Sequence, residues 1–181
     1  VNARMCELAG GVADGVVTHS TNSDPDYLRD VVRPALQRGA EAVGRSGLPQ
    51  LVASTAVATG STDLLVEQER ERQRRMLAFL LSTPAYAATL KRKGWHELSD
   101  GLRALIKAQR WDDLPTVLSD VVLDQLVTTG RYDQLPDLLR AKYTGIADGV
   151  VLPPISDDEN EDQPVQACVR DLQSGAPDGL D

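Results

Sequence analysis

Residues 11–18 read Gly-Val-Ala-Asp-Gly-Val-Val-Thr, and residues 145–152 read Gly-Ile-Ala-Asp-Gly-Val-Val-Leu. Each copy is a short turn followed by a β-branched run, and each follows a segment whose apolar residues have helical spacing. A further strand is predicted between the two copies. Repeated units of a helix and a buried strand indicate a parallel α/β sheet, in which ligands bind beyond the carboxyl ends of the strands.

The strands predicted from these patterns cover residues 13–18, 51–58 and 146–152. Their apolar residues are nearly continuous, as expected when both faces of a strand are buried. A complete eight-stranded barrel takes about 250 residues, and an isolated sheet of this size would leave its edges and core face exposed. The missing strands are therefore expected either upstream of Val1 or on another chain.

Helices are predicted between these strands. One covers residues 3–11, and another begins at Asp24-Pro25 and is expected to kink at Pro34. Residues 61–144 keep a helical pattern, which is far longer than an ordinary crossover between parallel strands. We therefore expect a long helical insertion before the final strand.

Two features of this insertion have a structural interpretation. Arg70, Arg72 and Arg74 are interpreted as a solvated helix face with ion pairs, although such a run can also clamp an acidic ligand. Trp95 and Trp111 stand among helical signals and are expected to anchor the core.

The composition of the chain changes near residue 155. Residues 1–155 are predicted to form the α/β part. Residues 156–181 begin with an acidic run and continue with Gly, Pro and Asp. They are predicted to form a mostly disordered acidic tail, with one or two helical turns at most near residues 165–172.

The overall composition is that of a globular domain. Of 181 residues, 41% are hydrophobic and 25% are charged, and the formal net charge is -8. This acidic balance argues against nucleic-acid binding, which depends on cationic contacts to phosphates. No apolar run approaches the ~20 residues of a membrane helix, and no signal peptide is evident. Cys6 and Cys168 fit no metal or redox spacing, which favours reduced thiols and a cytoplasmic location.

The sequence carries no motif for a metal site or for a nucleophile. It lacks a phosphate-binding loop, a dinucleotide fingerprint, a paired-His zinc helix and a nucleophile elbow. No metal is therefore predicted, and any chemistry is expected from a bound organic cofactor.

The first candidate site follows the first predicted strand and contains Thr18, His19 and Ser20. His19 can donate a hydrogen bond or move a proton near neutral pH. The alternative interpretation is a loop histidine that is bonded to the backbone or to water.

The second candidate site is the start of the helix predicted over residues 3–11. Here the backbone N–H groups of Ala3, Arg4 and Met5, together with the Arg4 charge, would bind an anion. Every helix has such an end, so the spacing by itself is a weak signal.

Several motifs, in the same order along the chain, resemble the bacterial luciferase-like monooxygenase family. The segment 1–10, Val-Asn-Ala-Arg-Met-Cys-Glu-Leu-Ala-Gly, and the following Ala-Asp-Gly-Val-Val-Thr-His of residues 13–19 resemble the second half of these proteins. The branch that uses a deazaflavin coenzyme is the most similar. The later motifs are Ser82-Thr83-Pro84-Ala85-Tyr86, Gly94-Trp95, Trp111, residues 119–126, Gly130, Leu139 and Tyr143-Thr144-Gly145. Together they extend the resemblance over residues 1–152.

The resemblance implies a fold class and a ligand. The fold would be α/β, a partial TIM barrel holding the last three strands, and the coenzyme would be coenzyme F-420 or, alternatively, FMN. The phosphate side of the coenzyme would rest on Val1, Asn2, Arg4 and Met5. The substrate side would contain Thr18, His19 and Asn22. The strand with Ser54 and Thr55 would run toward the same face.

The reaction implied by this resemblance is hydride transfer between the deazaflavin and a small organic substrate. The alternative is flavin-dependent oxygenation. Residues near the reactive ring come largely from earlier strands in such barrels, so His19 is the one proton-transfer candidate. The rival interpretations are a non-catalytic half-barrel that binds a partner chain or a second copy, and a truncated, inactive remnant of the enzyme.

Overall fold

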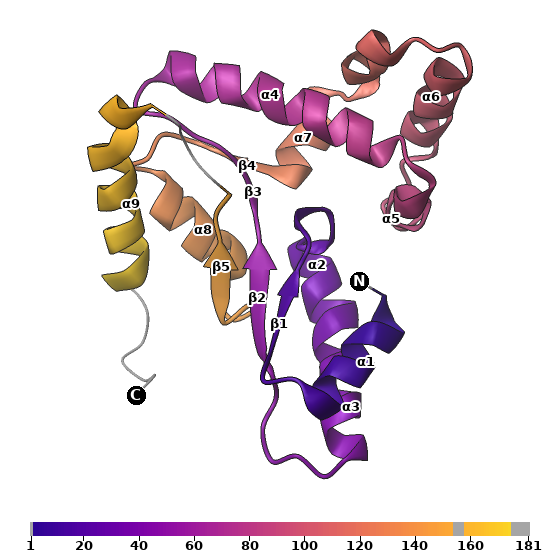
Figure 1. Cartoon of the computed structure of the whole chain (residues 1–181), viewed down its shortest axis with the longest axis vertical. Helices are drawn as coiled ribbons and strands as arrows, with labels where there is room; N and C mark the ends of the chain where they lie inside the picture. Colours follow the sequence, from indigo (N-terminus) through magenta and orange to yellow (C-terminus); the bar gives the residue numbers. More distant parts are fainter. Residues whose placement is uncertain (1, 154–157, 175–181) are drawn as a thin grey trace.

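The computed structural model describes residues 2–153 and 158–174. Within these ranges the chain is an α/β fold of many helices around small parallel sheets (Figure 1). The strands are β1 (Gly15–Thr18), β2 (Gln50–Ser54), β3 (Ala56–Ala58), β4 (Val127–Thr129) and β5 (Gly149–Val151). The helices are α1 (Ala3–Val12), α2 (Pro25–Tyr27), α3 (Arg33–Ala42), α4 (Asp63–Leu81), α5 (Ala87–Arg92), α6 (His96–Lys107), α7 (Asp120–Leu126), α8 (Leu135–Tyr143) and α9 (Asp162–Ser174).

The segment 50–58 runs through both sheets. Its first part, β2, lies between β1 and β5, and both of these strands are parallel to it. Its second part, β3, pairs in parallel with β4. Between the two parts, the N–H of Thr55 donates to the Val151 carbonyl at 3.0 Å, and the Thr55 hydroxyl donates to the same oxygen at 3.2 Å. Thr55 therefore marks the point where the segment leaves one sheet for the other.

The two copies of the repeated phrase flank β2 and enter the sheet in similar ways. The Gln50 N–H donates to the Asp14 carbonyl at 2.9 Å, and the Asp148 N–H donates to the Leu51 carbonyl at 2.8 Å. The Asp148 carboxylate also accepts from the Leu51 N–H at 2.7 Å and from Arg33 at 2.8 Å. The Asp14 side chain is exposed and has a longer contact, 3.3 Å, with Arg45. The two equivalent aspartates therefore differ in their role.

One face of the β1-β2-β5 sheet is covered by helices. Leu51 and Ala53 on this face are fully buried and pack with residues of α1, α3, α8 and α9. Val17 and Val151, on the opposite face by register, are 59% and 43% exposed. The sheet is therefore apolar on both faces, and the described residues cover one of them fully. A second core lies around β3, β4 and α4 to α7, in the upper part of Figure 1.

Helices α1 and α3 approach each other through glycine. A Cβ atom on Gly39 would lie 1.8 Å from the Glu7 carbonyl oxygen, and a Cβ atom on Gly10 would lie 2.1 Å from the Leu36 carbonyl oxygen. Both glycines are buried. The pairing of these helices therefore depends on the absence of side chains at the crossing point.

The predicted strands are confirmed in place but differ in extent. The first and third strands are shorter than predicted, and the predicted strand 51–58 divides into β2 and β3. The strand β4 was missed, because residues 61–144 were predicted to be helical throughout. Its three β-branched residues follow directly on α7 at Leu126, with no Gly or Pro between the two elements.

The helix predicted over residues 3–11 is confirmed as α1. Asp24 caps α2, and its carboxylate accepts from the Tyr27 N–H at 3.3 Å. The helix is irregular just before Pro34, where residues Leu28–Val32 form a π-helical turn. Pro34 itself lies in the first turn of α3. Trp95 packs against the second core as predicted, whereas Trp111 is 50% exposed and does not anchor it.

The expectation of disorder is wrong for part of the acidic tail, whereas the helical stretch predicted near residues 165–172 is confirmed within a longer helix. Residues 158–174 contain a short 3-10 turn and the helix α9, which packs along α8 in Figure 1. Cys168 is buried against the first core, and Leu172 packs beside it. These contacts join residues that are far apart in the sequence, so they could not be inferred from the polar composition of the segment. Residues 156–157 and 175–181 lie outside the described residues.

Replacement of Gly39 by Ala should destabilise the protein. The added methyl group would overlap the Glu7 carbonyl and push α1 away from α3, at a cost of about 1–3 kcal/mol. Urea unfolding measures this cost. The matched control is Gly47→Ala, since a Cβ at Gly47 meets no atom within 4 Å. Equal unfolding midpoints for the two variants would show that the helix crossing tolerates a side chain.

Replacement of Asp148 by Asn should destabilise the protein, and Asp14→Asn should have little effect. Burial opposes ionisation of Asp148, but hydrogen bonds from Arg33 and from the Leu51 N–H outweigh it and lower the pKa of Asp148. The lowered pKa contributes stability above about pH 4, the unfolded pKa, and this contribution is lost as the pH falls through the folded pKa. We expect a loss of about 0.5–1.5 kcal/mol at pH 7.

Urea unfolding at pH 7 and at pH 3 tests this expectation. The difference between the wild type and Asp148→Asn should shrink at the lower pH. A difference that stays constant between the two pH values would contradict the assigned role of the carboxylate.

Candidate functional site

A cleft of about 660 Å³ opens at the carboxyl ends of the strands. This volume is within the range of ligand pockets. The lining residues come from the loop after β1, from residues 54–60, from α4, from the turn after β4 and from the segment before α9. They are Ser20, Ser54, Thr55, Ala56, Thr59, Gly60, Leu65, Gln68, Glu69, Arg72, Gln73, Met76, Tyr132, Pro153, Asp158 and Glu161. The cleft thus lies at the edge where parallel α/β folds bind ligands.

Helix α4 supplies one wall of the cleft. Thr62 caps this helix, because its hydroxyl accepts from the Leu65 N–H at 3.3 Å. The lining residues of α4 recur at intervals of three and four residues, so they share one face of the helix. They are Leu65, Gln68, Glu69, Arg72, Gln73 and Met76. This spacing was the signal in the sequence for the cleft, and we missed it because the run was interpreted by its charge.

A hydrogen-bond network on this face centres on Glu69. Arg72 donates to both carboxylate oxygens, at 2.6 and 2.7 Å, and the Gln73 side-chain amide donates to one of them at 2.8 Å. Gln73 is 2% exposed. The carboxylate therefore holds the guanidinium and the amide in fixed positions.

Two polar atoms on the cleft wall are buried without a hydrogen-bond partner in the part of the chain that the structure describes. They are Gln73 Oε1 and Thr59 Oγ1. Thr59 is 4% exposed. A buried polar atom without a partner costs about 1–3 kcal/mol, so such atoms in a cleft point to a ligand or a bound water.

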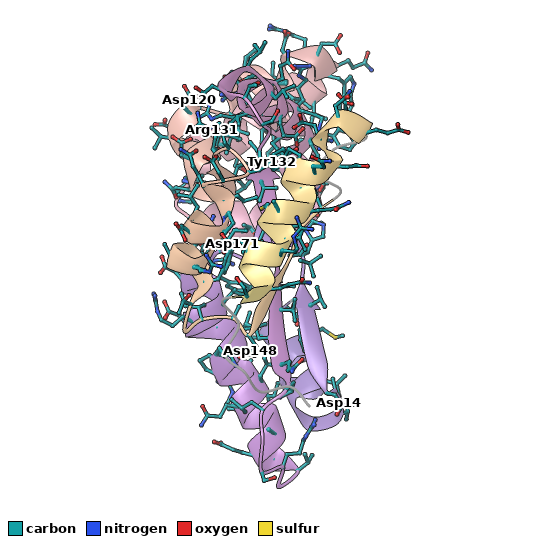
Figure 2. The ribbon with its side chains drawn as sticks, turned by 90° about the vertical axis from the view of Figure 1, so that its left-hand side faces the viewer. Asp14, Asp120, Arg131, Tyr132, Asp148 and Asp171 are labelled. Carbon is teal, nitrogen blue, oxygen red and sulfur yellow. The ribbon has the colours of Figure 1, made fainter. Side chains whose placement is uncertain are left out.

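Glu161 closes the cleft from the side of α9. Its carboxylate accepts from the Ser61 N–H at 3.0 Å and from the Ser61 hydroxyl at 2.6 Å. Burial raises the pKa of Tyr132, and the Glu161 charge with the hydrogen bond between these two side chains raises it further. Figure 2 shows Tyr132 in the upper half of the molecule, near the upper part of α9, with Asp148 and Asp14 well below it. Glu161 therefore fastens the segment before α9 to the turn between β3 and α4.

The predicted substrate-side residues lie at the end of β1 and in the loop after it, next to the cleft, but do not line it. Thr18 is buried, and its hydroxyl is 2.6 Å from the Ser23 hydroxyl. His19 is exposed, and its Nδ1 is 2.9 Å from the Thr21 hydroxyl. Asn22 Oδ1 accepts from the Thr89 hydroxyl at 3.4 Å. Among these neighbours Ser20 alone reaches the cleft. The contacts of His19 fit the alternative interpretation of a bonded loop histidine.

The predicted phosphate site lies at the start of α1. Asn2 Oδ1 accepts from the Met5 N–H at 3.0 Å, so this N–H is taken by the helix cap. The Ala3 and Arg4 N–H groups belong to the first turn, which has no earlier carbonyl within the helix to bind. Arg4 is exposed. Val1 lies outside the described residues. In Figure 1 the start of α1 lies at about the height where β1 ends.

A buried ionic group lies beside Asn22. Lys93 Nζ is 2.7 Å from the Asp24 carboxylate, and both side chains are largely buried. Lys142 Nζ donates to the Thr128 hydroxyl at 3.2 Å. Burial lowers the pKa of Lys142, and the nearby Lys93 lowers it further, whereas Asp24 opposes this change. These contacts join α5, β4 and α8 around the loop after β1.

The interpretation of Arg70 and Arg74 as a solvated helix face is wrong, although Arg72 is 59% exposed. Arg70 binds Asp120 at 2.8 Å and Asp124 at 2.7 Å, and its side chain is 13% exposed. Arg74 also binds Asp120 and donates to the Leu118 carbonyl. Both arginines therefore fasten α4 to α7, and the partners are too distant in the sequence to be inferred from helical spacing.

Replacement of Glu161 by Ala should destabilise the protein by about 1–3 kcal/mol. The change removes the buried carboxylate that accepts from Ser61 and from the buried Tyr132. Thermal unfolding of Glu161→Ala and of the exposed control Glu159→Ala measures the difference. Equal melting temperatures would show that Glu161 does not hold the segment before α9.

No helix of the described ranges is long and apolar enough to cross a membrane. Nor do these ranges hold a group of three or more His, Cys, Asp or Glu side chains that could bind a metal ion. The cleft offers acceptors, the buried carboxylate of Glu161 and a bound guanidinium. It can bind and orient a polar organic molecule, whereas reactivity would come from a cofactor.

A comparison with known families shows the family of this chain. Residues 1–149 match the model of the luciferase-like monooxygenase family. Uncharacterized proteins of Mycobacterium bovis and Mycobacterium tuberculosis are 33% identical over 152 residues, which are 83% of this chain and 44% of theirs. The chain thus spans less than half the length of these relatives.

The fold also matches a solved structure. The coenzyme F-420-dependent tetrahydromethanopterin reductase of Methanopyrus kandleri superposes with a TM-score of 0.72. The match covers 97% of this chain and 49% of that protein, at 19% identity. At this identity the likeness concerns the fold.

Proposed function

Because the chain belongs to the luciferase-like monooxygenase family, we propose that it is part of an oxidoreductase that transfers a hydride between coenzyme F-420 and a small organic substrate. The main support for this proposal is the polar cleft at the carboxyl ends of the strands, which contains buried oxygens without a hydrogen-bond partner among the described residues. The fold shared with an F-420-dependent reductase favours the deazaflavin over FMN. When bound, the deazaflavin supplies the hydride chemistry.

The residues of this chain would bind and orient the reactants. The first turn of α1, with the Arg4 charge, would hold the phosphate side of the coenzyme, since a helix start attracts anions. His19, Thr18 and Asn22 would border the substrate side. Gln73 and Thr59 would hold polar groups within the cleft.

The open apolar face of the β1-β2-β5 sheet supports a further part of the proposal. Val17 and Val151 are exposed there, although their residue types are those of a core. Additional strands that close a TIM barrel would cover this face. We propose that the active protein has such strands, either in the same chain or in a partner.

Titration of the purified natural protein with F-420 and with FMN tests the coenzyme. We expect F-420 fluorescence to change on binding, and Arg4→Ala to weaken the affinity about tenfold, because one charged contact to the phosphate side is lost. The control is Arg38→Ala, an exposed arginine on α3.

Each outcome of this titration has a separate meaning. Binding of FMN alone would favour a flavin-dependent monooxygenase. No response to either compound would defeat the proposal. Equal affinities of Arg4→Ala and the wild type would remove Arg4 from the site.

A further inference from the structure

The orientation of the Gln73 amide is fixed by its surroundings. Its nitrogen donates to Glu69 at 2.8 Å. A flipped amide would turn its oxygen toward a carboxylate, which cannot donate a hydrogen bond when ionised. Gln73 Oε1 is therefore held as an acceptor on the cleft wall, where no described group donates to it.

Thr59 and Thr55 line the same cleft but differ in one respect. The Thr55 hydroxyl donates to the Val151 carbonyl at 3.2 Å. The Thr59 hydroxyl is equally buried and has no partner in the described ranges. Thr59 can therefore donate to a ligand without losing a bond within the protein, while Gln73 can accept from the ligand.

The charges around the cleft select against anions. Glu69, Asp158 and Glu161 carry carboxylates, and Arg72 is the cation among the lining residues. This guanidinium is bonded through two of its nitrogens to Glu69. A carboxylate or phosphate on the ligand would meet repulsion here, whereas an uncharged polar group would not. Leu65 and Met76, each partly exposed on the same helix face, offer apolar contact beside the polar atoms.

We propose that this cleft binds an uncharged carboxamide or alcohol group, which donates a hydrogen bond to Gln73 Oε1 and accepts one from the Thr59 hydroxyl. One part of this proposal rests on the proposed function, namely the identification of the ligand as the organic substrate. It assigns specificity to Gln73 and Thr59, with Glu69 as the positioning residue that orients the amide.

Matched small probes test the ligand chemistry. Benzamide and benzoate have nearly the same shape, but benzamide carries N–H donors and no charge, whereas benzoate is an anion. Titration of the purified natural protein, followed by protein NMR, should show saturable binding of benzamide. Benzoate should bind at least tenfold more weakly.

Variants locate the binding. Thr59→Val and Gln73→Met keep the size of each side chain and should each weaken benzamide binding about tenfold, the equivalent of one hydrogen bond. Thr144→Val is the control, since Thr144 is exposed and does not line the cleft, and this variant should bind benzamide as the wild type does. Benzoate binding as tight as benzamide, absence of benzamide binding, or equal affinity in all variants would each overturn the proposal.

Unfolding temperatures give a readout that needs no ligand. Thr55→Val loses a hydrogen bond and should melt about 2–4 °C lower. Thr59→Val should melt at the wild-type temperature or higher, since its hydroxyl has no partner to lose. A decrease equal to that of Thr55→Val would overturn the proposal. If the protein binds neither coenzyme but binds benzamide as expected, the proposed oxidoreductase function is excluded and the proposal for the cleft stands.

Discussion

The structure depends on how the segment 50–58 is shared between two sheets. Its first half is held by β1 and β5, and its second half is held by β4. Thr55 makes two hydrogen bonds to Val151 where the pairing changes. The residues that follow, up to Gly60, continue beyond the carboxyl edge of the first sheet (Figure 1). Both hydrophobic cores meet at this segment.

The cleft is a consequence of this arrangement. Helix α4 follows the segment 50–58 directly, and its inward face stands opposite the segment before α9, which Glu161 fixes to Ser61. The polar atoms of Gln73 and Thr59 are thereby buried away from any described partner. Native proteins keep few such atoms, because each lowers stability. Their position at the edge where parallel α/β folds bind ligands supports the proposed binding role.

The sequence predicted the parts of the fold that are encoded locally. The repeated phrase located β1 and β5, because a continuous β-branched run after a turn is typical of a buried parallel strand. It did not predict β4 or the packing of α9, since Thr128 and Glu161 gain their partners from residues far along the chain. The cleft was not predicted for the same reason. Glu69 and Gln73 look like surface residues of a charged helix until the fold places α4 against the sheet edge.

A crystal structure of the natural protein with coenzyme F-420 would test most directly that ligands bind at this edge. We expect electron density for the deazaflavin beyond the carboxyl ends of β1 and β2, with its phosphate side toward the start of α1. A ligand group in the cleft should lie within hydrogen-bond distance of Gln73 Oε1. Density confined to the helix-covered face of the β1-β2-β5 sheet would contradict the assignment of the cleft as the functional site.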